Sequence, residues 1–188
     1  MKSNIAIAFA AIPTMLAAET WHVAPGGNNG SNGRTLATAW AAIQHAADVA
    51  VSGDTVLVHP GDHQGFAAME NSGTAIGPIV FRATGQGVYI TSPCGYNGLD
   101  GINVEGVEHV VIEGFTFRYA SDAHLPWSGA WNSTVRIHPE ATGCVIRNNL
   151  FGDAARVIAE DFRFDSSNNG LTSASSDFRA AGFVPGAH

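Results

Sequence analysis

Positive charge is scarce in this sequence. Its 188 residues carry nine lysine and arginine side chains against 16 acidic ones, a formal net charge of −7, and Lys2 is the single lysine. Nucleic acids are bound mainly through cationic contacts to phosphates, so no nucleic acid is expected as a partner. Charged residues make up 13% of the chain and hydrophobic residues 45%. This balance excludes a wholly disordered chain and is sufficient for one domain with its own core.

Cysteine is equally scarce, with Cys94 and Cys144 as the two examples. In the repeat described below they fall two coils apart, which is about 10 Å at the spacing of adjacent strands. A disulfide needs Cα atoms within about 7 Å of each other. We therefore expect two free thiols, with Cys144 in the core and Cys94 in a turn.

Long hydrophobic runs are absent after the N-terminus. The run at residues 5–16 is interrupted by Pro13 and is too short for a membrane span, which takes about 20 residues. Lys2 precedes this run and small residues follow it, so residues 1–18 are typical of a secretory signal peptide, with a buried first helix as the alternative. The prediction is a secreted or periplasmic protein without a membrane span.

Residues 19–53 predict a strand, a loop rich in glycine and asparagine, and one amphipathic helix. The helix is expected over residues 38–50, with Thr38 as its N-cap. Its apolar positions recur at helical spacing, at Trp40, Ile43, Ala47 and Ala50. Because the helix directly precedes the first repeat, we expect it to cap the open end of the stack.

Short strand-like segments repeat through residues 54–160. One series starts at Val56, Ile79, Ile102, Val135 and Val157, and a second starts at Val88, Val110 and Cys144. Successive starts lie about 22–23 residues apart, except that each series contains one longer step. One insertion of about 11 residues, between Phe117 and Ser133, explains both long steps. A fixed short period predicts an all-β solenoid, whereas an antiparallel sandwich would show turns but no such register.

The register is lost in residues 161–188, which are rich in serine and asparagine. We expect a degenerate or poorly ordered tail. The small number of coils before it suggests a truncated relative of a longer solenoid.

Several motifs resemble those of a known family. They read Trp-x-Val-Ala-Pro-Gly-Gly, Ala-Trp-Ala-Ala-Ile-Gln-His-Ala-Ala-Asp, Gly-Asp-Thr-Val-Leu-Val-His-Pro-Gly, Pro-Ile-Val-Phe-Arg-Ala and His-Val-Val-Ile-Glu-Gly-Phe-Thr-Phe. Over residues 20–158 the chain resembles right-handed parallel β-helix proteins of the pectate-lyase-like superfamily, most closely polysaccharide lyase family 9. The resemblance implies a right-handed parallel β-helix that acts on an extracellular, uronate-containing polysaccharide.

The same resemblance implies β-elimination by a lysine base, with Ca²⁺ as cofactor held by clustered aspartates. The chain beyond residue 18 has no lysine, and no aspartate cluster stands on its coils. Arg136 is the substitute base that we name, by analogy with pectate lyases that use arginine. Whether this chain is an enzyme is therefore left open.

Alternate residues of the predicted strands face outward and form columns. The first column contains His59, Arg82, Glu105, His138 and Glu160. Its neighbour contains Leu57, Val80, Asn103, Arg136 and Ile158, and a third contains Thr91, Glu113 and Arg147. These columns have two interpretations. They form a solvated charge ladder, or His59, Arg82, Glu105, Arg136 and His138 line a groove for a sugar chain.

The insertion offers a second candidate site. Tyr119, Trp127 and Trp131 have flat faces suited to stacking on a sugar ring, although they could equally shield the side of the solenoid. Asp122 and His124 are candidate metal ligands within it.

These observations predict a secreted, monomeric, lyase-like β-helix that acts on or binds an acidic polysaccharide. The alternative is a non-catalytic solenoid that serves as a glycan-binding or cell-surface module.

Overall fold

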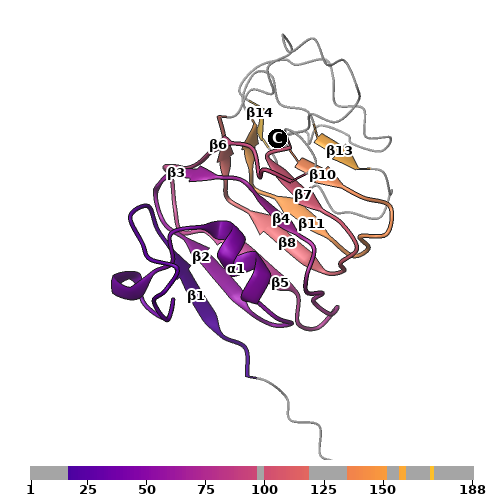
Figure 1. Cartoon of the computed structure of the whole chain (residues 1–188). Helices are drawn as coiled ribbons and strands as arrows, with labels where there is room; N and C mark the ends of the chain where they lie inside the picture. Colours follow the sequence, from indigo (N-terminus) through magenta and orange to yellow (C-terminus); the bar gives the residue numbers. More distant parts are fainter. Residues whose placement is uncertain (1–16, 97–99, 119–134, 152–156, 160–169, 172–188) are drawn as a thin grey trace, which may run out of the picture.

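The chain folds into a stack of parallel strands. The computed structural model describes residues 17–96, 100–118, 135–151, 157–159 and 170–171. Three sheets run along the stack, and every strand pair within them is parallel (Figure 1). The fold is a parallel β-solenoid of about four coils with one α-helix, which confirms the predicted fold class.

Each sheet collects strands from successive coils. Sheet A contains β1 (Thr20–Val23), β2 (Thr55–Val58), β5 (Ile79–Ala83), β8 (Val110–Glu113) and β11 (Val145–Arg147). Sheet B contains β3 (Gly61–Gln64), β6 (Val88–Ser92), β9 (Thr116–Phe117), β12 (Leu150–Phe151) and β14 (Gly170–Leu171). Sheet C contains β4 (Phe66–Ala68), β7 (Ile102–Val104), β10 (Val135–Ile137) and β13 (Val157–Ala159).

Helix α1 (Ile43–Val49) lies against β4, the end strand of sheet C (Figure 1). The side-chain amide of Gln44 donates to the carbonyl oxygen of Ala67 at 3.0 Å and accepts its N–H at 2.8 Å. An end strand otherwise leaves such backbone groups without a strand partner. Gln44 thus closes this edge, in agreement with the capping role expected for the helix.

The helix is shorter than the predicted range of 38–50, and Thr38 is not its N-cap. Thr38 ends a 3-10 turn, η1 (Leu36–Thr38), and Ala42 is the residue that caps α1. Trp40 is in extended backbone between them, where it bridges Val23 and exchanges hydrogen bonds with strand β1 and the residue after it. This pairing prevents a helix from starting before residue 43.

The residues that stack on one another differ from those that the predicted period selects. Val56 pairs with Phe81, and Ile79 pairs with Val110, so Ile79 and Ile102 lie in different sheets. Both of these steps along the chain are longer than the predicted period. They exceed it because the connections between strands vary in length from coil to coil.

Parts of the predicted series are confirmed. Ile102, Val135 and Val157 stack directly in sheet C, and Glu113 pairs with Arg147 in sheet A. In the second series, Val88 belongs to sheet B and does not stack on Val110. Assigning a strand to the wrong sheet predicts the wrong stacking partner. It does not change which of its side chains point inward, since side chains alternate with a period of two along any strand.

The interior of the solenoid is filled by aliphatic and phenylalanine side chains. Phe66 and Phe81, from sheets C and A, have ring centroids 4.5 Å apart and are both at most 1% exposed. The other large side chains with less than 2% exposure include Ile102, Ile112 and Phe117. Each sheet therefore contributes to one continuous core.

The bend from sheet A to sheet B requires left-handed backbone. Gly114 has φ 83° after β8, and Asn148 has φ 55° at the equivalent place after β11. Glycine and asparagine are the residues that adopt this conformation most readily. The next residue in the second bend, Asn149, is buried and bonds the backbone of the coil below.

Both cysteines are free thiols as predicted, with Cys144 buried and Cys94 half-buried. No helix within the described ranges is long and apolar enough to cross a membrane. The N-terminal run at 5–16 and most of the tail at 161–188 lie outside the described residues, so the signal peptide and the disordered tail stay predictions. Strand β14 continues sheet B beyond residue 160, where the coils were expected to end.

Candidate functional site

The outer face of sheet C carries a polar column over two successive coils. Asn103 on β7 pairs with Arg136 on β10, and both side chains face away from the core because their neighbours in each strand point inward. The ladder continues one step further, where the N–H of His138 donates to the carbonyl oxygen of Val104 at 2.9 Å. Residue His138 therefore lies above Glu105, as the predicted column requires.

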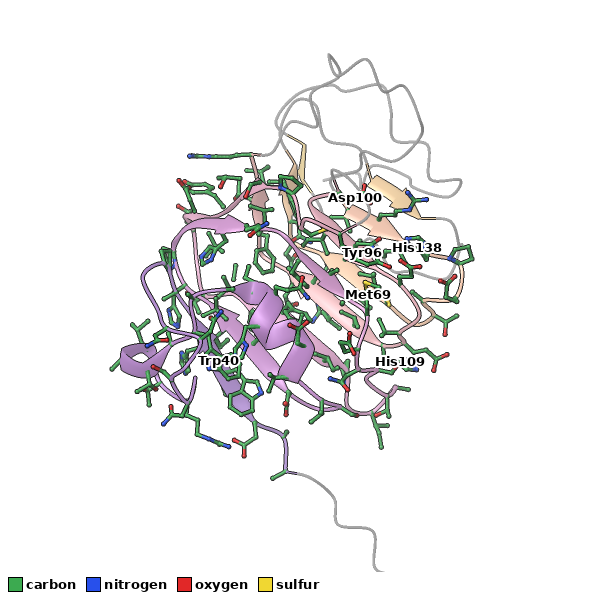
Figure 2. The ribbon with its side chains drawn as sticks, in the orientation of Figure 1. Trp40, Met69, Tyr96, Asp100, His109 and His138 are labelled. Atoms are coloured by element: carbon green, nitrogen blue, oxygen red, sulfur yellow. The ribbon has the colours of Figure 1, made fainter. Side chains whose placement is uncertain are left out.

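A compact group of side chains forms where this ladder ends. Each of Glu105, His138 and Glu140 offers one carboxylate oxygen or ring nitrogen, and these three atoms lie within 4.8 Å of one another. Glu140 is exposed in the turn after β10, whereas the side chains of Glu105 and His138 are 29% and 19% exposed. We call these three residues the EHE cluster. In Figure 2 its central residue, His138, lies at the sheet C side of the solenoid, away from Trp40.

Asn103 supports the EHE cluster from below. It is 1% exposed, and its Oδ1 atom lies 3.0 Å from Nε2 of His138. Its Nδ2 atom donates to Oε2 of Glu105 at 3.3 Å, and that oxygen lies 3.6 Å from Nε2 of His138. One buried amide thus fixes the positions of two side chains that come from different coils.

Arg136 does not fit the role of an exposed base. It was expected to face outward into a groove, and it does leave the core face of β10, but the residue is 3% exposed. A general base must reach the proton that it removes from the substrate. The buried position of Arg136 therefore argues against proton abstraction at this guanidinium.

His59 lies at a different place from the EHE cluster, so the single predicted column is wrong at this residue. It follows β2 in sheet A, and its Nε2 atom lies 2.9 Å from Nδ1 of His22 on β1. The two rings stack with an interplanar angle of 12°. Nearby, Nε2 of the buried His63 lies 2.8 Å from the carbonyl oxygen of His59.

Two of these histidines, His59 and His63, favour the neutral state. Burial lowers the pKa of His59 below its ordinary value of 6.5, and the charges of His22 and His63 lower it further. Burial also lowers the pKa of His63, against the opposing effects of its bond to His59 and of Asp62. Protonation of His59 would also place positive charge beside His22 at a hydrogen-bond distance.

Acidification should therefore weaken the N-terminal coils. Since the pKa of His59 and His63 is lower in the folded chain than in the unfolded one, their contribution is complete above pH 6.5 and is lost as pH falls below it. We expect the urea midpoint to fall between pH 7.5 and 5.5, and to fall less in His59→Gln. An identical loss in the variant would show that His59 has no part in this pH dependence.

Arg82 is also separated from the EHE cluster. It pairs in register with Glu113 and not with Glu105, and Arg82 and Arg147 both bond the carboxylate of Glu113. Thr91 was predicted to stack in one column with Glu113 and Arg147, but it belongs to β6 in sheet B. Burial opposes ionisation of Glu113, but the hydrogen bonds and charges of the two arginines outweigh it and lower its pKa below 4.5.

Loss of the Glu113 carboxylate should destabilise the chain modestly. The arginine side chains are 47% and 41% exposed, so we expect Glu113→Gln to lower the free energy of unfolding by only about 1 kcal/mol. The contribution of Glu113 should be lost as pH falls below 4.5, since its folded pKa is depressed. Urea unfolding measures both effects. Glu19→Gln, at the exposed Arg34 pair, is the control, and an equal effect there would contradict this account.

The remaining predicted site residues lie outside the described residues. These are Glu160 and, in the insertion, Tyr119, Trp127, Trp131, Asp122 and His124. Their roles in stacking on sugar or binding metal stay predictions.

Sequence reasoning missed Glu140. Alternation along a strand identifies only residues within strands, and Glu140 follows its strand in a turn. The signal that could have found it is its spacing, since it stands two positions after His138. Asn103 was placed in the correct column, but its burial and its bonds to the neighbouring column were not predicted.

The fold defines the chain as a parallel β-solenoid protein. A segment of 64 residues is 34% identical to Alpha-1,3-galactosidase A of Akkermansia muciniphila, and it covers 33% of this chain and 11% of that protein. The chain thus spans about one tenth of the length of this curated relative. No family model and no solved structure matches the chain. These comparisons give a weak link to carbohydrate and no support for polysaccharide lyase family 9 in particular.

Proposed function

We propose that this chain binds an extracellular polysaccharide at the edge of sheet C, just after β7 and β10, where the EHE cluster is accessible and contacts the sugar. The observation that carries the proposal is the convergence of three charged or titratable side chains, from two coils, within 4.8 Å. The partial match to a galactosidase supports carbohydrate as the ligand class. The signal peptide expected at residues 1–18 supports export to the compartment where polysaccharides lie.

The chemistry of the cluster suits sugar hydroxyl groups. Carboxylates accept strong, charge-assisted hydrogen bonds, and an imidazole can donate or accept one. Asn103 holds Glu105 and His138 in place before a ligand arrives, which reduces the entropy lost on binding. Two carboxylates on a chain of net charge −7 favour a neutral sugar over a uronate, unless a cation bridges the uronate to the protein.

Glycoside hydrolysis is the second candidate function. It needs two carboxyl groups on either side of the bond, about 5–5.5 Å apart in retaining enzymes. The oxygens that Glu105 and Glu140 contribute to the EHE cluster lie within 4.8 Å of each other, so two carboxyl groups do converge here. β-Elimination has less support, because Arg136 is the base that the sequence offered and it is buried.

Binding and catalysis can be tested together on the full chain. Titration calorimetry with galactan, polygalacturonate and an α-1,3-linked galactosyl oligosaccharide should detect binding to at least one of them. We expect Glu105→Gln to weaken that binding by about tenfold, the loss of one charge-assisted hydrogen bond. Asp62→Asn removes an exposed acid on sheet B and should leave binding unchanged.

The outcomes separate the candidates. Release of reducing ends identifies hydrolysis, a rise in ultraviolet absorbance from unsaturated uronide identifies elimination, and binding without product identifies a glycan-binding module. Failure of all three glycans to bind, or an equal effect of Glu105→Gln and Asp62→Asn, would contradict the proposed site.

A further inference from the structure

We infer that Glu105, His138 and Glu140 bind one divalent transition-metal ion of the zinc class. This inference concerns the ion alone and does not depend on whether the chain binds a glycan. It rests on the ligand types in the EHE cluster, on their separations and on the buried amide beside them.

The separations are close to those of a metal site. Four ligands at about 2.0–2.2 Å around a tetrahedral zinc ion stand about 3.3–3.6 Å from one another. Oε2 of Glu105 and Nε2 of His138 are already 3.6 Å apart. The third ligand atom lies within 4.8 Å of both, on a glutamate side chain that is exposed and can turn inward. Small rotations of the Glu140 side chain therefore bring all three ligand atoms to the separations of a zinc site.

The donor set selects the class of ion. Calcium takes six to eight oxygen ligands, and a site with a central imidazole and two carboxylates does not provide them. Imidazole nitrogen with carboxylate oxygen suits zinc and its neighbours. Three protein ligands also leave the fourth position open, as in zinc sites that bind a water molecule or a substrate. The residues thus do not fit the Ca²⁺ that the family resemblance implied.

Asn103 holds two of the three ligands in position. Its amide is 1% exposed, yet it reaches outward to both partners and lies 3.0 Å from the nitrogen of His138 that faces Glu105. An ion at that nitrogen replaces its hydrogen bond to Oδ1 of Asn103, while Nδ2 of Asn103 still holds Glu105 in place. Hydrogen bonds to a ligating carboxylate orient the ligands of known metal sites in this way.

Charge also supports the assignment. The cluster brings two carboxyl groups within 4.8 Å of each other, and a divalent ion between carboxylates removes their mutual repulsion. Arg34, Arg82 and Arg147 bond Glu19 and Glu113 and do not reach this cluster. A divalent cation is a suitable partner for two carboxylates that lie this close together.

Calorimetric titration of the chelator-treated full chain with zinc chloride tests the inference. We expect one ion per chain, with affinity reduced about 100-fold in His138→Gln and strongly in Glu140→Gln, which changes an exposed residue and should not affect folding. Circular dichroism checks the fold of each variant. Calcium chloride should give at least tenfold weaker binding than zinc.

His59→Gln is the matched control, because it removes one imidazole from the His22–His59 pair, which lies away from the EHE cluster. Its zinc affinity should equal that of the unaltered chain. Zinc binding that is lost in His59→Gln and kept in His138→Gln would overturn the inference, as would no binding or equal binding of calcium. Since no glycan is present, failure here leaves the proposed glycan site standing, and glycan binding measured with chelator tests that site separately.

Discussion

Replacing Phe81 by alanine should lower the free energy of unfolding by about 3–5 kcal/mol, the usual cost of removing a buried aromatic ring. Phe81 is 1% exposed, and its ring packs against Phe66, which belongs to another sheet. The cavity would therefore remove packing between two sheets of the solenoid, sheets A and C. Equilibrium unfolding in urea measures the change.

The neighbouring residue provides the control. Val80 precedes Phe81 on β5, faces the other side of the strand and is partly exposed. We expect Val80→Ala to lower the free energy of unfolding by less than about 1 kcal/mol, since little apolar surface leaves a buried site. Equal losses at the two positions would mean that β5 does not have an inner and an outer face.

Replacing Asn149 by alanine should lower the free energy of unfolding by about 2–4 kcal/mol, because two buried backbone groups lose their partners. Its Oδ1 atom accepts the N–H of Phe115 at 2.9 Å, and its Nδ2 atom donates to the carbonyl oxygen of Ile112 at 3.0 Å. The side chain is 2% exposed as part of a bend that links sheets A and B. Chemical denaturation with a fluorescence readout checks the value.

Asn148, one residue earlier, is the matched control. It is exposed and has φ 55°, a conformation that glycine adopts without strain. Asn148→Gly should therefore change the free energy of unfolding by no more than about 0.5 kcal/mol. If Asn149→Ala were as mild, the bonds between coils at this bend would not contribute to stability.

The class of fold could be predicted because two kinds of evidence agreed. Alternating apolar residues mark strands that have one face in a core, and glycine or asparagine between them marks bends. The predicted series that aligns Val110 with Cys144 also places Gly114 over Asn148, and both have left-handed backbone. The recurrence of these segments predicted a solenoid, although the period of about 22–23 residues used for that prediction does not hold in sheet A.

The register could not be predicted in the same way. Each coil passes through three sheets, and its connections vary in length, so similar tripeptides recur at intervals that are not one coil. One predicted period after Ile79, the chain has reached Ile102 on β7 in sheet C, and it returns to sheet A only at Val110. The faces were nevertheless correct, because inward and outward positions alternate along any strand.

The residues of the candidate site were likewise predicted correctly in part and wrongly in part. Glu105 and His138 were correctly predicted to lie one above the other. The longer step that was predicted across the insertion is the step by which β10 follows β7 in sheet C. His59 and Arg82 were assigned to that column by the same arithmetic, but Arg82 lies on β5 of sheet A and His59 directly follows β2 of that sheet. Burial of Arg136 and the contact of Glu140 depend on packing and turn geometry, which alternation along a strand does not specify.

The central claim is that successive coils bring Glu105 and His138, which are far apart in the sequence, into contact and so assemble the EHE cluster. Nuclear Overhauser contacts on isotope-labelled protein test this most directly. We predict a contact between the amide proton of His138 and the α-protons of Val104 and Glu105, together with one between Val56 and Phe81. Contacts that join Ile79 to Ile102 as neighbours, or the close α-proton pairs of antiparallel strands, would contradict the account.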